Sequence, residues 1–180
     1  MFKKIGFLSV LATICMTAFA NEAFLMNYFD QLSTIEADFE QTVIQQKNKD
    51  VSSGELKIRK KTAKDPMAGF YFDYTEPFEQ KLISNGQKLW HYDVDLEQVV
   101  IKNLAQFEQD SPMFMIFNNQ SLNTQFNIKT IKNESKYQLT PKKKGDVNSI
   151  EIEFSKGNLS KISAKQVNGS LDLKLSNVKI

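Results

Sequence analysis

The chain has 180 residues, with 23 basic and 21 acidic side chains, one Cys and one His. This near-neutral balance argues against a nucleic-acid-binding protein, whose surface usually carries a basic face. A single Cys excludes internal disulfides, so stability must come from an apolar core. The basic runs Arg59–Lys61 and Lys142–Lys144 are interpreted as solvent-exposed turns and strand edges.

The first twenty residues are predicted to be a signal peptide. Lys3 and Lys4 precede an apolar run, and Ala18 and Ala20 place small residues just before a cut at Asn21. The alternative is an uncleaved membrane anchor, but the run is shorter than the roughly 20 residues that a membrane-spanning helix needs. This segment therefore predicts an exported protein.

Cys15 raises the alternative of a lipoprotein, because a lipoprotein precursor is cut immediately before a Cys that then becomes acylated. Such a cut normally requires a small residue before the Cys, and the bulky Ile14 occupies that place. The predicted signal peptide therefore comprises residues 1–20, and residues 21–180 form a single domain. Without the two lysines of the signal peptide, 21 basic residues balance 21 acidic ones.

The first element of the domain is predicted to be a helix over Ala23–Ser33. Its apolar residues fall on one helical stripe, made of Phe24, Leu25, Tyr28, Phe29 and Leu32. Three strands are predicted next, because apolar and polar residues alternate over Ala37–Val43, Ser52–Arg59 and Phe70–Tyr74. Pro77 ends the third strand.

The stretch Lys81–Asn103 is predicted to be a three-stranded meander. Asn85-Gly86 is a strong hairpin signal, because a type I′ turn needs positive φ at both central positions. A second reversal at Asp93–Asp95 leads into a third strand over Leu96–Ile101. Such a meander indicates a sheet that shelters something apolar.

The second half of the chain is predicted to open with a short helix. Ser111 is the expected N-cap and Pro112 the first helical residue before Met113–Asn118. The remaining segments alternate as strands do, over Phe126–Ile131, Tyr137–Leu139, Ile150–Phe154, Leu159–Val167 and Leu171–Leu175. About ten strands and two helices in this order predict an antiparallel sheet curled around helices, a mainly β fold with helices (α+β).

The sequence offers no group set for catalysis, so we expect no enzyme and no cofactor. His91 alternates away from Trp90 toward solvent and has no Cys or second His with which to share a metal. Asp93, Asp95 and Glu97 lack the glycine and the bidentate Glu of a calcium loop and are interpreted as turn residues. No phosphate-binding loop, nucleophile elbow or HExxH motif is present.

A series of short motifs carries a family resemblance. They are Phe39–Val43, Gly54–Leu56, Phe70–Pro77, Ile83–Gly86, Leu89–Asp93, Leu96–Val99, Ser111-Pro112 and Tyr137–Lys142. Each motif is weak alone, but their order and spacing over essentially the whole mature chain resemble the periplasmic outer-membrane lipoprotein carrier family, LolA.

The resemblance implies a fold and a function. The family fold is an unclosed antiparallel β-barrel whose concave apolar face is covered by a helical lid. The implied function is to shield the acyl chains of lipoproteins and shuttle them through the periplasm. Its partners would be acylated lipoproteins, an inner-membrane lipoprotein-releasing ABC transporter and an outer-membrane lipoprotein receptor, with no nucleic acid, and the protein would be a monomer.

The expected site residues come from alternation and from the resemblance together. The acyl-chain cavity is assigned to Leu56, Ile58, Phe70, Phe72 and Trp90, and the lid to Phe29, Ile116 and Phe117. For every one of these side chains, ordinary packing in a core is the alternative interpretation.

One departure from the family concerns a lid-locking Arg that ends the second strand and is normally followed by Pro. Counting from Gly54 places Lys60 at that position, with Arg59 before it and Lys61 in place of the Pro. Residues one step apart on a strand point to opposite faces, so Arg59 could substitute only with a bulge or a register change. Lys60 can donate to carbonyls but lacks the planar donor fork of Arg.

Three alternatives to the carrier remain open. The outer-membrane lipoprotein receptor has the same fold but is itself a lipoprotein, which the signal-peptide cut disfavours. A periplasmic protein that binds another lipid would also have this architecture. An interaction domain with a filled β core, binding a protein on its surface, is the alternative from a different class.

Overall fold

A computed structural model describes residues 16–60, 68–104, 111–118 and 120–180. Most of the predicted signal peptide and the segment 61–67 lie outside these residues. The helices are α1 (Met16–Gln31), α3 (Pro112–Phe117) and α4 (Leu122–Gln125). The strands are β1 (Thr34–Gln45), β2 (Asn48–Arg59), β3 (Gly69–Glu76), β4 (Gln80–Ser84), β5 (Lys88–Asp93), β6 (Gln98–Asn103), β7 (Phe126–Lys132), β8 (Lys136–Pro141), β9 (Val147–Ser155), β10 (Asn158–Gln166) and β11 (Gly169–Lys179).

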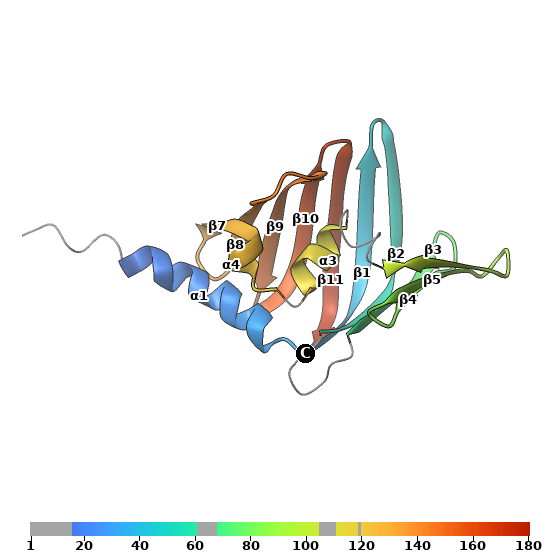
Figure 1. Cartoon of the computed structure of the whole chain (residues 1–180), viewed down its shortest axis with the longest axis horizontal. Coiled ribbons are helices and arrows are strands. Elements are labelled where there is room, and N and C mark those ends of the chain that lie inside the picture. The colour runs from blue at the N-terminus through green and yellow to red at the C-terminus, as the bar shows by residue number, and fades with distance from the viewer. Residues whose placement is uncertain (1–15, 61–67, 105–110, 119) are drawn as a thin grey trace, which may run out of the picture.

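All of these strands belong to one antiparallel sheet in the order β6-β5-β4-β3-β2-β1-β11-β10-β9-β8-β7. The sheet stays open, because β6 and β7 are its two edges and do not pair with each other. Figure 1 shows that β3 to β6 turn away from the tall β1–β2 hairpin, and that the helices lie over one face of the sheet. The predicted fold, an unclosed antiparallel sheet around helices, is confirmed.

Several strands of the sheet bury every second side chain, as the alternation predicted. In β3, Phe70, Phe72 and Tyr74 are buried, while the residues between them are partly exposed. Strand β9 repeats the pattern with Ile150 and Ile152. A large apolar side chain contributes about 1.5–3 kcal/mol when it leaves water, so this shared face carries the main stabilising term of the fold.

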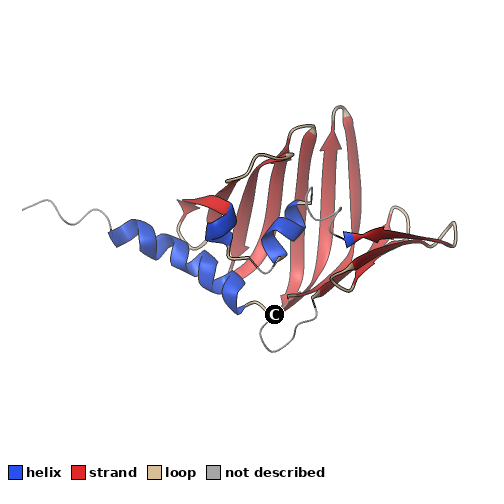
Figure 2. Cartoon of the chain, viewed as in Figure 1, coloured by secondary structure: helices blue, strands red, loops and turns tan. Residues whose placement is uncertain are grey.

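Helix α1 covers the concave face through the predicted stripe. Leu25 and Phe29 are buried on one side of the helix, and Leu32, directly after its end at Gln31, is buried as well. The Tyr28 ring lies 4.8 Å from the Phe154 ring, and the Tyr28 hydroxyl accepts a hydrogen bond from the backbone N–H of Leu159 at 3.3 Å. These contacts attach α1 to β9 and β10. Figure 2 shows the helices, in blue, on one side of the red sheet.

Helix α1 begins at Met16, upstream of the predicted start at Ala23, and so runs through the expected cleavage position. The cut before Asn21 remains a prediction. Within the residues that the structure describes, no helix is long and apolar enough to cross a membrane.

The Asn85-Gly86 turn differs from the expected type I′ geometry. Gly86 has φ +85°, whereas Asn85 stays outside the positive-φ region, and Ser84 pairs with Leu89. The Asn85 side-chain oxygen instead accepts hydrogen bonds from the backbone N–H groups of Gln87 and Lys88 at 3.1 and 3.0 Å. The meander itself is confirmed by the β4–β5 and β5–β6 ladders.

Gly54 marks the place where β3 comes close to β2. A Cβ at this position would lie 1.8 Å from the carbonyl oxygen of Asp73, which no side chain could tolerate. The pairing of β2 with β3 also shifts register between Ser53 and Gly54. A glycine at such a point permits a tight bend of the sheet, here beside the lobe formed by β3 to β6.

Candidate functional site

The floor of the candidate site is built by cross-strand pairing. Ile58 of β2 pairs with Phe70 of β3, and Phe70 pairs with Ser84 of β4. Paired residues of a sheet point to the same face, so these side chains form one row on the concave side. Phe72, two residues after Phe70, adds a second aromatic ring at a centroid distance of 5.9 Å.

The opposite wall comes from α3 and from Leu104, which directly follows β6. The Phe114 ring lies 4.5 Å from the Phe70 ring, so it covers the floor directly. Met113 and Phe117 also line the space, and the Phe117 ring lies 5.8 Å from that of Phe29 on α1. The pocket between these walls is partly open to solvent and has a volume of about 560 Å³, within the range of roughly 300–1,000 Å³ that is typical of ligand sites.

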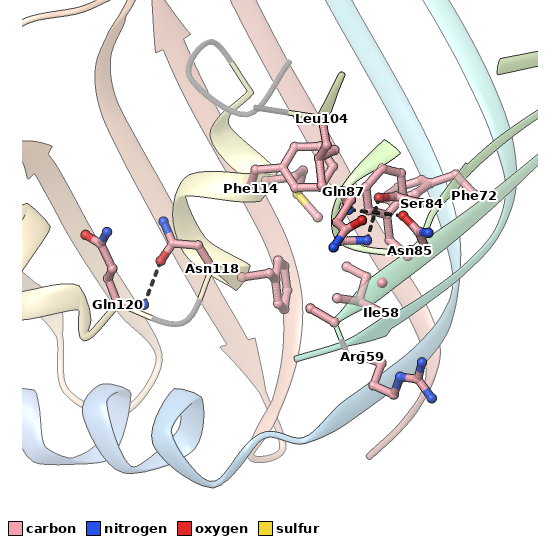
Figure 3. A pocket seen from close by; sticks show the side chains of 16 residues that line it. Ile58, Arg59, Phe72, Ser84, Asn85, Gln87, Leu104, Phe114, Asn118 and Gln120 are labelled. Atoms are coloured by element: carbon pink, nitrogen blue, oxygen red, sulfur yellow. Dashed lines mark hydrogen bonds between the residues drawn. The ribbon is translucent and has the colours of Figure 1, made fainter. Parts of the chain in front are cut away.

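Neutral polar groups border the pocket on two sides. Asn85 and Gln87 lie on one side at the β4–β5 turn, and Asn118 and Gln120 lie on the other side, just beyond α3 (Figure 3). The backbone N–H of Gln120 donates to the side-chain oxygen of Asn118 at 3.0 Å. The described lining includes no carboxylate, and its one charged residue, Arg59, directs its guanidinium away from the pocket. The pocket therefore suits an apolar ligand that meets neutral polar groups at the borders of the site.

Lys60 joins the sheet to the lid. Its ammonium donates to the backbone carbonyl of Phe29 at 2.7 Å, and its backbone N–H donates to the carbonyl of Ser33 at 2.9 Å. Burial lowers the pKa of the Lys60 ammonium, and the nearby Asp30 carboxylate partly offsets that effect. Of the two predicted lock residues, Lys60 is the one bonded to this carbonyl of the lid helix.

Arg59 lies on the other face of the strand. Thr34 pairs with Arg59 and Ile35 with Ile58 without a register shift at this end of β2, so the bulge that Arg59 would need is absent here. Arg59 is exposed, and Figure 3 shows its guanidinium pointing away from the pocket.

The expectation that Trp90 faces the cavity is wrong. Leu89 pairs with Ser84 and therefore continues the inward row, so its neighbour Trp90 points to the outer face opposite Ile83. Leu89 is 2% exposed, whereas Trp90 is only half-buried.

His91 is also placed differently from the expectation, because it shares the concave face with Leu82 rather than pointing to solvent. Its Nε2 lies 2.7 Å from the Gln80 side-chain oxygen. Among the residues described, no group of three His, Cys, Asp or Glu side chains could hold a metal ion.

The other predicted positions are buried on the lid or the concave face. Ile58, Phe70, Phe72 and Phe117 line the pocket, while Leu56, Phe29 and Ile116 pack in the surrounding core. Their role in binding acyl chains remains a prediction. Sequence reasoning missed the lining residues Met113, Phe114, Leu104 and Ser84. The apolar run of α3 was the only signal that could have found the first two.

Comparisons with known proteins agree with this architecture. Residues 30–179 match the family described as "Outer membrane lipoprotein carrier protein LolA". The outer-membrane lipoprotein carrier protein of Francisella philomiragia is 34% identical over 85% of this chain and 74% of its own length. That of Methylococcus capsulatus is 32% identical over 68% of this chain, which spans 59% of the relative.

A solved structure titled "Crystal structure of MucB" superposes with a TM-score of 0.52 at 11% identity, covering 90% of this chain and 59% of that one. At this identity the superposition shows the fold alone. The family match and the first relative carry more weight, because they cover most of the chain with the pocket strands and the lid. The chain belongs to the outer-membrane lipoprotein carrier family.

Proposed function

We propose that this protein carries acylated lipoproteins across the periplasm with their acyl chains held in the pocket between the concave sheet and α3. It would accept them from an inner-membrane ABC transporter and deliver them to an outer-membrane receptor. The observation that carries the proposal is the apolar floor of Ile58, Phe70 and Phe72 under the lid ring of Phe114. Membership of the carrier family supports the same function.

The energy of acyl chains in water explains why such a carrier needs a pocket. Each methylene removed from water contributes about 0.8 kcal/mol, so a chain of roughly fifteen methylenes resists exposure by on the order of 12 kcal/mol. A carrier must replace the bilayer with an apolar surface of its own. The pocket lining supplies that surface without chemistry, since it includes no nucleophile–base pair among the described residues.

Release requires that the empty pocket be stable by itself. The rings of Phe70 and Phe114 contact each other at 4.5 Å, and Lys60 holds the lid helix through the Phe29 carbonyl. These contacts stabilise a closed state once cargo has left. Opening the lid on cargo binding would break them, so cargo and lid contacts compete for the same surfaces.

A binding experiment on the mature protein tests the proposal. Phe72→Glu should abolish binding of a diacylated lipopeptide, because an unpaired carboxylate against acyl chains is strongly disfavoured. Phe72→Leu is the matched control and should retain binding. Circular dichroism would establish that both variants fold. Equal binding by folded Phe72→Glu and wild type would overturn the pocket assignment.

Cellular location and transfer need a second experiment. Depletion of the protein followed by membrane fractionation should leave lipoproteins in the inner membrane. N-terminal sequencing of the periplasmic form should begin at Asn21. An acylated terminus at Cys15 would contradict the carrier and favour a membrane-attached receptor.

A further inference from the structure

The two edges of the sheet are built differently. Strand β7 carries Lys129 and Lys132, and its pairing with β8 shifts register between Thr130 and Lys132. Edge lysines and bulges are devices that prevent another strand from adding to a sheet. Strand β6 pairs with β5 over its whole length without a shift, and Lys102 is its one charged residue. Edge β6 therefore has less of this protection than β7, with one lysine and no register shift.

Strand β6 also exposes apolar side chains on both faces. Val99, Val100 and Ile101 are 54%, 47% and 59% exposed. Val100 pairs with His91 on the concave face, while Ile101 pairs with Trp90 on the outer face. Three consecutive exposed apolar residues on a straight edge strand form a template for an added strand.

This edge is continuous with the pocket. Strand β6 ends at Asn103, and the next residue, Leu104, is buried and lines the pocket. The backbone N–H of Leu104 donates to the carbonyl of Gln87, another lining residue, at 3.0 Å. The chain direction of β6 therefore leads toward the side of the pocket that Asn85 and Gln87 border.

We propose that the polypeptide segment directly after the acylated N-terminal residue of a cargo lipoprotein adds to β6 as an antiparallel strand. This inference rests on the proposed carrier function. When its acyl chains lie in the pocket, the N-terminus of the cargo chain lies beside the C-terminal end of β6. The cargo chain then runs from Asn103 toward Gln98, which is antiparallel to β6. The added strand would extend a sheet that is already antiparallel throughout.

Backbone pairing explains how one carrier can accept many sequences. Every residue except Pro offers the same N–H and C=O groups, so strand addition recognises an extended chain rather than particular side chains. The six residues of β6 span about 20 Å at roughly 3.4 Å per residue. Lys102 lies on the concave face, because it pairs with the buried Leu89. An acidic residue early in the cargo segment would complement it.

N-methylated lipopeptides test the inference without altering the protein. Two diacylated lipopeptides of one sequence would carry N-methyl groups on alternate backbone amides, one set on odd and the other on even positions. In an added strand, one set of N–H groups faces β6 and the other faces solvent. We expect one isomer to bind about tenfold more weakly, equivalent to about 1.4 kcal/mol, and the other to bind like the unmethylated peptide.

The outcomes separate this inference from the proposed function. Binding of the unmethylated peptide with equal affinities for both isomers would overturn strand addition and leave the carrier function standing. Equal weakening of both isomers would also overturn it, because an added strand directs only every second N–H group toward β6. Failure of the unmethylated lipopeptide to bind would overturn the carrier function and the inference with it.

Photo-cross-linking locates the segment independently. A photoreactive residue in place of Val100 on β6 should cross-link to the bound lipopeptide, and one in place of Ile131 on β7 should not. These residues have the same 47% exposure and lie on opposite edges of the sheet. Cross-links between two copies of the protein at position 100, without peptide, would identify a second copy as the occupant and overturn the proposal.

Discussion

The ammonium of Lys60 donates to the backbone carbonyl of Phe29 at 2.7 Å, so a residue next to the pocket strand β2 holds the lid helix α1. The bond spans 31 positions in the sequence. Ile58, two residues before Lys60, forms part of the pocket floor. The segment from Ile58 to Lys60 therefore contacts both the pocket floor and the lid helix.

Lys60→Met should weaken the closed state while keeping a side chain of similar length. Loss of the hydrogen bond should destabilise the closed state by about 1 kcal/mol, and by up to about 3 kcal/mol because the donor is charged. Part of this loss is offset, because the closed state no longer has to desolvate the partly buried Lys60 ammonium. The open population should rise roughly five- to hundred-fold. Transfer assays should show normal loading but poor delivery to the receptor.

Arg59→Met is the control for Lys60→Met, because Arg59 lies on the opposite face of β2. It should leave loading and delivery close to those of the wild type. Normal delivery by Lys60→Met together with failure of Arg59→Met would move the lock to Arg59. Normal delivery by both variants would mean that lid opening does not depend on this bond.

Phe114→Ala should strengthen cargo binding by up to about tenfold, because the ring fills part of the empty pocket and must move aside for an acyl chain. Delivery to the receptor should slow correspondingly. Fluorescence titration with a labelled lipopeptide measures the affinity. Met115→Ala, on the same helix but outside the pocket lining, should change affinity little. Weaker binding by Phe114→Ala would instead make this ring a direct contact for cargo.

Leu89→Ala should destabilise the fold by about 2–5 kcal/mol, as expected for a fully buried Leu. Trp90→Phe should cost less than about 1.5 kcal/mol, since Trp90 is only half-buried on the outer face. Urea unfolding followed by circular dichroism compares the two variants without relying on tryptophan emission. The reverse order of stabilities would place Trp90, rather than Leu89, on the inward face.

Tyr74 should make the fold sensitive to alkaline pH. Burial among Phe39 and Phe72 raises the pKa of Tyr74 to about 12, against 10.0 for the free side chain, and the Gln41 side chain only partly opposes this. Above pH 10 the unfolded chain therefore loses this proton before the folded protein does. Stability is complete below pH 10 and should fall by about 2–3 kcal/mol as the pH rises to about 12.

Tyr74→Phe removes this loss, because Phe has no proton to release. The difference in unfolding free energy between wild type and Tyr74→Phe should stay constant up to pH 10. Between pH 10 and 12 the wild type should lose unfolding free energy relative to Tyr74→Phe. A difference that stays constant over the whole range would show that Tyr74 ionises freely in the folded protein.

The spacing of apolar residues correctly predicted the segments in which these residues fall on one face of a strand or helix. The alternation of Phe70, Phe72 and Tyr74 and the stripe containing Leu25 and Phe29 are confirmed, because each has one apolar face and one polar face. Such segments can bury their apolar residues in only one way. The family resemblance supplied what periodicity cannot, namely that the sheet stays open and that helices cover its concave side.

The errors arose where neighbouring residues are apolar on both faces. Leu89 and Trp90 are adjacent, so alternation alone could not decide which points inward; the pairing of Leu89 with Ser84 decides it. The helix α3 is apolar at each position from Pro112 to Phe117, so no stripe singled out Phe114. Lys60 and Arg59 remained alternatives until the unbroken β1–β2 register excluded a bulge at that end.

The 4.5 Å contact between Phe114 and Phe70 makes the lid ring an intramolecular competitor for the pocket. Because the ring is tethered through α3, its effective concentration at the floor is fixed by the chain, in the millimolar range or above for a short tether. A ligand must bury more apolar area than the ring to displace it. Short or single-chain lipids would therefore be rejected, whereas the several chains of one lipoprotein could displace the ring together.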